Sequence, residues 1–127
     1  RDDRIKIAAA KALANSKNPD AGLALKNYII KLEFADAPYL VQEAFLRTFA
    51  RLNQVWSLRF LTKFVKKGAA MLARPKEEEL AVAAAKALAE VPTQRTIDCL
   101  EDAAKSRKKK VRDAAKEALE KLKGGKA

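Results

Sequence analysis

The sequence predicts an all-α fold in which antiparallel helix pairs stack one after another as a right-handed α-solenoid. Three observations predict this fold. Strong helix formers dominate the composition, and only four glycines and four prolines interrupt the 127 residues. No stretch shows the alternation of apolar and polar residues that is typical of strands. The third observation is a sequence repeat, which also predicts how many helix pairs the chain forms.

The repeat is a nine-residue apolar pattern that begins at Ile5, Val41, Leu80 and Val111, at intervals of 36, 39 and 31 residues. Each copy ends on an apolar residue eight positions later, on the same face of a helix. In the first three copies a leucine follows 12 residues further on, so the turn inside each unit should have one constant length. The pattern predicts units of two helices, which we name A and B, that bury their apolar faces by stacking.

We expect one domain of about three and a half units over residues 1–127. The units are expected at about 1–36, 37–75 and 76–106, with a half unit at 107–123. The seven helices are expected near residues 3–15, 19–33, 37–52, 54–72, 76–90, 93–106 and 108–122. Because the chain starts at Arg1 rather than Met, we expect it to be a fragment of a longer protein.

Turn and capping residues separate the first four expected helices. Asn18-Pro19 and Asn53 can cap the B helices of the first two units. Asp36-Ala37-Pro38 precedes the second A helix. These signals agree with the boundaries that the repeat predicts.

The third unit and the half unit carry clearer signals. Arg74-Pro75 precedes the third A helix, and Glu77–Glu79 follow in its first turn, where acidic residues suit the helix dipole. Pro92-Thr93 opens the third B helix. Gly124-Gly125 ends the last helix.

The copies at Ile5–Leu13 and Val111–Leu119 share a core of Val or Ile, a basic residue, two alanines and a final Ala-Leu. This core resembles HEAT repeats, particularly the short bacterial kind grouped with phycocyanobilin-lyase-like repeats. The resemblance covers nearly the whole chain, although Ala81 replaces the basic residue in the third copy and bulky residues replace alanines in the second. The resemblance implies a scaffold for protein contacts; a minority of HEAT arrays are bilin lyases or alkylpurine DNA glycosylases.

The reactive residues of many enzymes are missing from the sequence. It has no histidine and one cysteine, Cys99, which excludes an intrachain disulfide, zinc fingers and histidine-based catalysis. Cys99 lies in an apolar helical stretch, where a buried structural thiol is expected. We therefore predict no catalytic residue, no cofactor and no metal site. No apolar run approaches the ~20 residues of a membrane span, and we expect a cytoplasmic location.

The positive charge is concentrated in two blocks. The net charge of +11 divides into +2 for residues 1–36, +6 for 37–75, −3 for 76–106 and +6 for 107–127. The second unit combines cations with aromatic residues, since Trp56, Phe60 and Phe64 follow one stripe of its B helix. These aromatic residues either pack between repeats or contact a partner, and the core is the more typical place for Phe60 and Phe64. The predicted partner-binding residues are Arg47, Arg51, Trp56, Arg59, Lys63 and Lys67.

The second basic block is a candidate anion site at the start of the last helix. Its residues are Arg107, Lys108, Lys109, Lys110 and Arg112. Cations oppose the helix dipole at this position, so they are locally unfavourable. Backbone amides together with cations could bind an anion there, and a solvated loop is the alternative.

The preferred function is a non-catalytic scaffold that binds a protein partner, one with acidic groups, on the concave face lined by B helices. The alternative is binding of nucleic acid or another phosphate backbone by the second unit and the run Arg107–Lys110. The repeat register favours a protein, because Asp98 and Asp102 occupy the positions of Arg59 and Lys63 in the next unit. A phosphate-binding groove should stay basic along its length.

Two further alternatives follow from the resemblance and from the chain ends. An enzyme, either a bilin lyase or a DNA glycosylase, has no supporting motif in the sequence. Uncovered stacking faces at the two ends predict either a longer parent protein, which we prefer, or end-to-end association of isolated copies.

Overall fold

The computed structural model describes residues 37–51 and 55–124, together with Ala8 and Ala12; Phe49 and residues 55–57 are described by their backbone alone. The described helices are α4 (Tyr39–Arg51), α5 (Val55–Ala69), α6 (Pro75–Leu88), α7 (Gln94–Ala103) and α8 (Lys109–Gly124). Over these residues the predicted all-α fold is confirmed, and the ends of the five helices lie within three residues of the expected positions, with the largest differences at the carboxyl ends of α5 and α7. The helices expected at 3–15 and 19–33 lie outside the described residues, apart from Ala8 and Ala12, which are helical.

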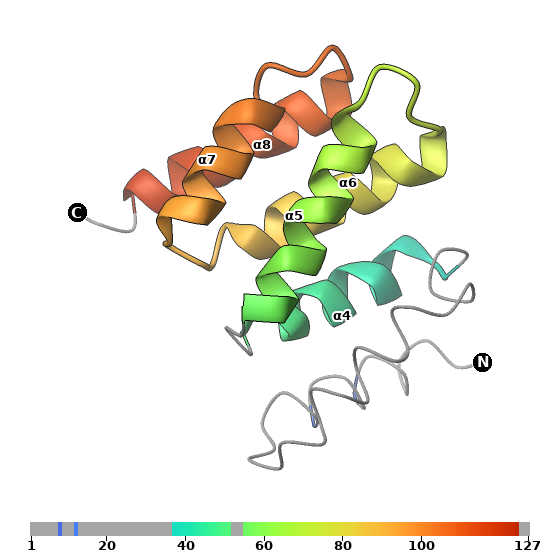
Figure 1. Ribbon diagram of the computed structural model, residues 1–127. Coiled ribbons are helices and arrows are strands. Elements are labelled where there is room, and N and C mark those ends of the chain that lie inside the picture. The colour runs from blue at the N-terminus through green and yellow to red at the C-terminus, as the bar shows by residue number, and fades with distance from the viewer. Residues whose placement is uncertain (1–7, 9–11, 13–36, 52–54, 125–127) are drawn as a thin grey trace.

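The five helices form two layers (Figure 1). In one layer α6 lies between α4 and α8 and contacts both. In the other layer α5 contacts α7. The layers meet where α5 packs on α6 and α7 packs on α8. No described helix is long and apolar enough to cross a membrane.

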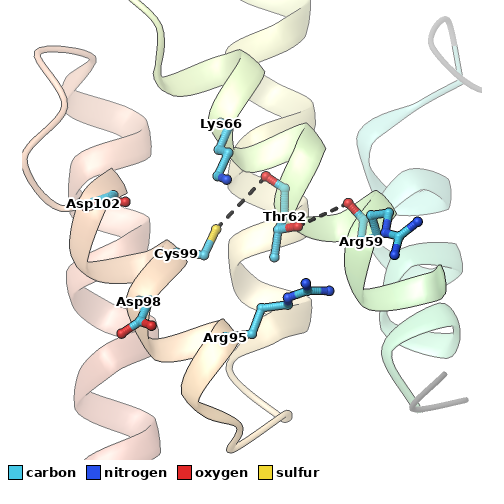
Figure 2. Close-up of a pocket in the computed structure, with 7 residues that line it drawn as sticks. All are labelled: Arg59, Thr62, Lys66, Arg95, Asp98, Cys99 and Asp102. Atoms are coloured by element: carbon cyan, nitrogen blue, oxygen red, sulfur yellow. Dashed lines mark hydrogen bonds between the residues drawn. The ribbon is translucent and has the colours of Figure 1, made fainter. Parts of the chain in front are cut away.

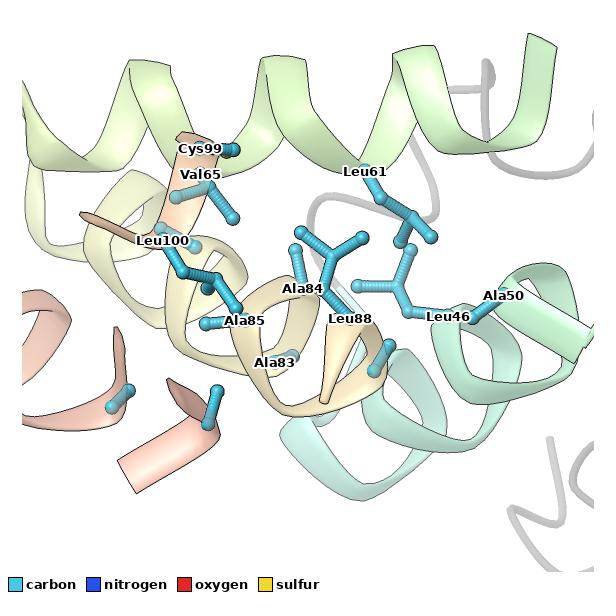
Figure 3. Close-up of a cluster of buried hydrophobic side chains, with 14 of the residues drawn as sticks. Leu46, Ala50, Leu61, Val65, Ala83, Ala84, Ala85, Leu88, Cys99 and Leu100 are labelled. Carbon is cyan, nitrogen blue, oxygen red and sulfur yellow. The ribbon is translucent and has the colours of Figure 1, made fainter. Parts of the chain in front are cut away.

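The core is built around α6, whose alanines are buried on several sides. Ala81, Ala83, Ala84, Ala85 and Ala87 are all at most 1% exposed. Figure 3 shows larger side chains from the neighbouring helices filling the space around them. Those that are fully buried include Leu46 of α4, Leu61 of α5 and Leu100 of α7, and Leu88 of α6 itself is also fully buried. Small side chains let a helix surrounded by three others approach each of them closely.

The closest approach is at Gly68 of α5, which lies against the first turns of α6. A Cβ atom added there would overlap the Ala81 side chain and the carbonyl oxygen of Glu77, and would lie 3.1 Å from the Glu77 carbonyl carbon. The absence of a side chain at Gly68 therefore allows this crossing of α5 and α6.

The helix starts that the sequence predicted in the third unit have clear causes. Thr93 caps α7, since its Oγ1 accepts a hydrogen bond from the Thr96 amide at 3.2 Å. Pro75 occupies the start of α6, and the Arg74 amide donates to Glu77 Oε1 at 2.9 Å. Local capping therefore sets both boundaries.

The repeat positions and the aromatic stripe contribute to the core. Val41 and Val111 are fully buried, whereas Leu80 is partly buried. Phe60 and Phe64 pack against the buried cluster with their ring centroids 6.3 Å apart and their planes tilted by 45°. These two rings therefore contribute to packing.

Candidate interaction site

A groove runs between α5 and α7, the helices that the sequence predicted as the B helices of the second and third units (Figure 2). Its volume is about 350 Å³. The lining residues are Arg59, Thr62 and Lys66 of α5 and Arg95, Asp98, Cys99 and Asp102 of α7. A smaller hollow of about 210 Å³ shares Lys66, Cys99 and Asp102 with it and continues toward Ala70 and Ala103. On each of the two helices the lining residues of the groove recur three or four positions apart, so they lie on one face of that helix.

The floor of the groove is formed by Thr62 and Cys99. The Thr62 hydroxyl donates to the Arg59 carbonyl oxygen at 3.0 Å, and the Cys99 thiol donates to the Thr62 carbonyl oxygen at 4.0 Å. Burial raises the pKa of the Cys99 thiol to about 11; Lys66 opposes this shift and Asp102 adds to it. The thiol is therefore protonated near neutral pH and is a poor nucleophile.

The walls of the groove carry charges of both signs that are not paired with one another. Figure 2 shows the Arg95 side chain extending from α7 toward α5. Asp98 accepts a hydrogen bond from Gln94 on its own helix at 2.8 Å. The other charged lining residues make no ion pair with any described residue; they are Arg59, Lys66, Arg95 and Asp102. These four charges are free to contact a bound molecule.

The structure divides the predicted partner-binding residues into two groups. Arg59 and Lys63 are exposed on α5, and Arg59 lines the groove. Arg47, Arg51 and Lys67 instead join helices. Arg47 and Arg51 lie 3.2 and 3.4 Å from Glu90, two residues after the end of α6, and Lys67 lies 3.4 Å from Glu77 of α6. The Trp56 side chain lies outside the described residues.

A second hollow lies on the other layer, between α4, α6 and α8, with a volume of about 300 Å³. Three of its five charged lining residues are paired, since Lys86 lies 3.6 Å from Glu43 and Arg47 contacts Glu90. The other two, Glu117 and Lys121 of α8, make no ion pair with a described residue. The Lys86 ammonium also lies 5.4 Å from the centre of the Tyr39 ring. The Tyr39 hydroxyl and the Glu43 carboxylate raise the pKa of Lys86, which keeps this ammonium charged.

The five residues of the predicted anion site also fall into two groups, one that contacts other described residues and one that is exposed. Lys108 lies 3.4 Å from Glu78 of α6, and Arg112 donates to the Ser106 carbonyl oxygen at 3.3 Å. Arg107, Lys109 and Lys110 are exposed and make no ion pair with a described residue. Two members of the run therefore anchor the loop before α8, and three face solvent.

Sequence reasoning missed Arg95 and Lys66 as groove residues. Arg95 follows Trp56 by the 39-residue interval of the repeat, so the same register that selected Trp56 could have found it. Lys66 was not among the predicted partner-binding residues, because the rotation of α5 about its axis could not be read from the sequence.

The described residues contain no group of three or more cysteines, aspartates and glutamates placed to hold a metal ion. Comparison of the chain with protein-family models, with curated proteins and with solved structures gave no match. The groove presents exposed cations and two exposed carboxylates above an unreactive thiol, an arrangement suited to binding a charged surface.

Proposed function

We propose that this chain is a non-catalytic interaction module of HEAT-like α-solenoid architecture that binds a protein partner along α5 and α7. The architecture is supported by the order of contacts. Helices α4, α6 and α8 follow one another in one layer and α5 and α7 in the other, as expected for two A–B pairs and a further A helix. In that arrangement α5 and α7 are B helices, the ones expected on the concave face.

One observation carries the proposal: the α5/α7 groove has unpaired charges of both signs. The lining supplies three cations and two carboxylates, and only Asp98 has a side-chain partner in the described structure. A protein partner can match such a pattern with charges of its own, which favours correct over incorrect partners. The net positive sign of the groove favours a partner segment that carries acidic residues.

Nucleic acid is the second candidate, and the exposed cations Arg59, Lys63 and Lys66 favour it. Asp98 and Asp102 lie in the same groove, however, and would repel a phosphate backbone that followed α7. The mixed lining therefore fits a protein better.

Site-specific photocross-linking in cells that make this protein tests the proposal. A benzophenone amino acid replaces Lys63, which is exposed on α5, or Lys116, which is exposed on α8 and serves as the control position. We expect a discrete protein adduct from position 63 that survives nuclease treatment, and none from position 116.

A charge-reversal pair adds specificity to this experiment. Arg59→Glu with Arg95→Glu should remove the adduct, whereas Lys116→Glu with Lys123→Glu, which changes the net charge equally, should leave it. An adduct that contains nucleic acid would support the second candidate. Equal adducts from both positions would refute binding at the groove.

A further inference from the structure

Two loops lie next to each other at one end of the molecule: the α5–α6 loop, residues 70–74, and the α7–α8 loop, residues 104–108 (Figure 1). The Ser106 hydroxyl donates to the carbonyl oxygen of Ala69 at 2.7 Å, which joins the second loop to the end of α5. Lys108 lies 3.4 Å from Glu78, which joins it to the start of α6. These contacts hold both loops on one surface, which we name the loop end.

Met71 and Leu72 form an apolar tip on the loop end. They are 64% and 91% exposed, and the third exposed large apolar residue of the described chain, Leu40, lies at the start of α4. The Ala73 amide donates to the Ala70 carbonyl oxygen at 3.1 Å, so Met71 and Leu72 are the central residues of a tight turn. The turn presents two large apolar side chains to solvent without any packing partner in the core.

Cations surround this apolar tip. The exposed ones on the two loops and the adjoining helix turns are Lys66, Lys67, Arg74, Lys76, Lys105, Arg107, Lys109 and Lys110. Of the nearby carboxylates, Glu77 pairs with Lys67 and Arg74, and Glu78 pairs with Lys108. Asp102, which shares a hollow with Lys66 and Ala70, pairs with no described residue. Lys105, Arg107, Lys109 and Lys110 make no ion pair with a described residue. The loop end therefore combines an exposed apolar turn with a basic rim, whose four cations without an ion pair to a described residue outnumber the unpaired Asp102.

We propose that the loop end binds the surface of an anionic lipid membrane, with Met71 and Leu72 entering the headgroup region and the surrounding cations contacting lipid phosphates. Apolar side chains beside lysines and arginines are the combination that interfacial membrane binding uses. A surface for single-stranded nucleic acid would present aromatic side chains for base stacking, and no aromatic residue lies on either loop. This proposal concerns a surface at the end of the groove and does not depend on the proposed function.

Vesicle flotation tests the proposal with the whole chain. One set of vesicles is phosphatidylcholine alone, and the other contains phosphatidylcholine and phosphatidylglycerol in equal parts. We expect binding to the anionic set only, since each cation near an anionic surface strengthens binding roughly fivefold. Met71→Ser with Leu72→Ser should weaken binding by about tenfold or more. Arg107→Glu with Lys110→Glu should abolish it, whereas Lys116→Glu with Lys123→Glu should retain most of it.

A second measurement separates insertion from simple charge attraction. Leu72→Cys is labelled with an environment-sensitive dye, which the buried thiol of Cys99 does not take up under native conditions. The emission should shift to the blue on anionic vesicles, and a dye on Lys116→Cys should not shift. Failure to bind anionic vesicles, equal binding to both vesicle sets or an unshifted Leu72→Cys spectrum would each overturn the proposal. Self-association that Met71→Ser with Leu72→Ser removes, without vesicle binding, would instead assign the tip to protein contact.

Discussion

The two layers of the molecule carry similar hollows with different arrangements of charge. Between α4, α6 and α8 the hollow measures about 300 Å³, and the Glu43–Lys86 pair in its lining joins α4 to α6. Beside it, Glu90 in the segment after α6 pairs with Arg47 and Arg51 of α4. Between α5 and α7 the groove measures about 350 Å³, and its charges are not paired across the two helices. The paired charges of the first layer thus connect α4 to α6 and to the segment after it. The groove charges of the second layer form no such connection and are open to contact by another molecule.

The ion pairs of the first layer do not make it much more stable than the second layer. The side chains of Arg47, Arg51 and Glu90 are 42%, 60% and 39% exposed, and ion pairs as open to water as these contribute little each. Most of the stability comes from the alanine-rich packing of α6 against α4, α5 and α8. The pairs instead favour one position of α4 relative to α6.

The largest effect is expected where the two layers meet. Gly68→Ala places a Cβ atom into Ala81 and the Glu77 carbonyl oxygen, and backbone on both helices must move to admit it. Overpacking of this kind should lower the free energy of unfolding by about 3 kcal/mol. Chemical denaturation followed by circular dichroism measures the change.

Gly124→Ala is the matched control for this prediction. An added Cβ atom at Gly124 meets nothing within 4 Å at the end of α8, so its free energy of unfolding should stay equal or rise slightly. Equal stability of the two variants would mean that α5 and α6 do not cross closely at Gly68, and the two-layer arrangement would then be wrong.

The sequence predicted the helices better than it predicted the use of their charges. Helix starts depend on local chemistry, so Thr93 and Pro75 marked two of them correctly. The stripe Arg59, Lys63 and Lys67 predicted one binding surface, but Lys67 faces Glu77 of the next helix. Which cations are paired depends on how neighbouring helices are rotated and offset, and one-dimensional spacing does not contain that information.

The alignment of the second and third repeat units predicts more of the groove residues than the sequence analysis identified. It aligned Asp98 and Asp102 with Arg59 and Lys63 and so predicted the change of sign along the B helices. The same alignment places Arg95 opposite the position of Trp56. The regular spacing of Trp56, Phe60 and Phe64 marked Trp56 as a candidate, whereas no comparable pattern marks Arg95.

A smaller effect is expected at the floor of the groove. Burial raises the pKa of Cys99 to about 11, so at pH 8 its thiolate fraction should be about a hundredfold lower than in the unfolded chain. Alkylation by iodoacetamide should therefore be slowed at least a hundredfold in the native protein relative to the protein in denaturant. Mass spectrometry of quenched samples measures both rates.

The same pKa shift predicts how stability depends on pH. Because the folded thiol keeps its proton to higher pH than the unfolded thiol, the unfolded state binds fewer protons between about pH 9 and pH 11. The Cys99 contribution to the free energy of unfolding should fall across this window, and Cys99→Ser should reduce that fall.

One result would contradict the alkylation prediction. Rapid alkylation of the native protein at pH 8 would mean that α5 and α7 separate readily, so the groove would not be a fixed surface.

The smallest expected change in the free energy of unfolding comes from replacing one acidic residue near each of the two hollows. Glu90→Gln removes the partner of both Arg47 and Arg51 and should lower the free energy of unfolding by about 1 kcal/mol at low salt. Asp102→Asn removes an exposed acid of the groove that pairs with no described residue, and should change stability by less than about 0.5 kcal/mol. Molar salt should remove most of the Glu90→Gln effect by screening, and should leave Asp102→Asn unchanged.

A double-mutant cycle shows whether the Glu90→Gln effect comes from the ion pairs. Combining Glu90→Gln with Arg47→Met should cost less than the sum of the single changes, because both remove the same interaction. Lys66→Met with Asp102→Asn should be additive, since no ion pair joins these residues across the groove. Coupling of similar size in both cycles would mean that the groove charges pair in solution as those of the other layer do. The α5/α7 face would then have no free charges to offer a partner, and the contrast between the layers would disappear.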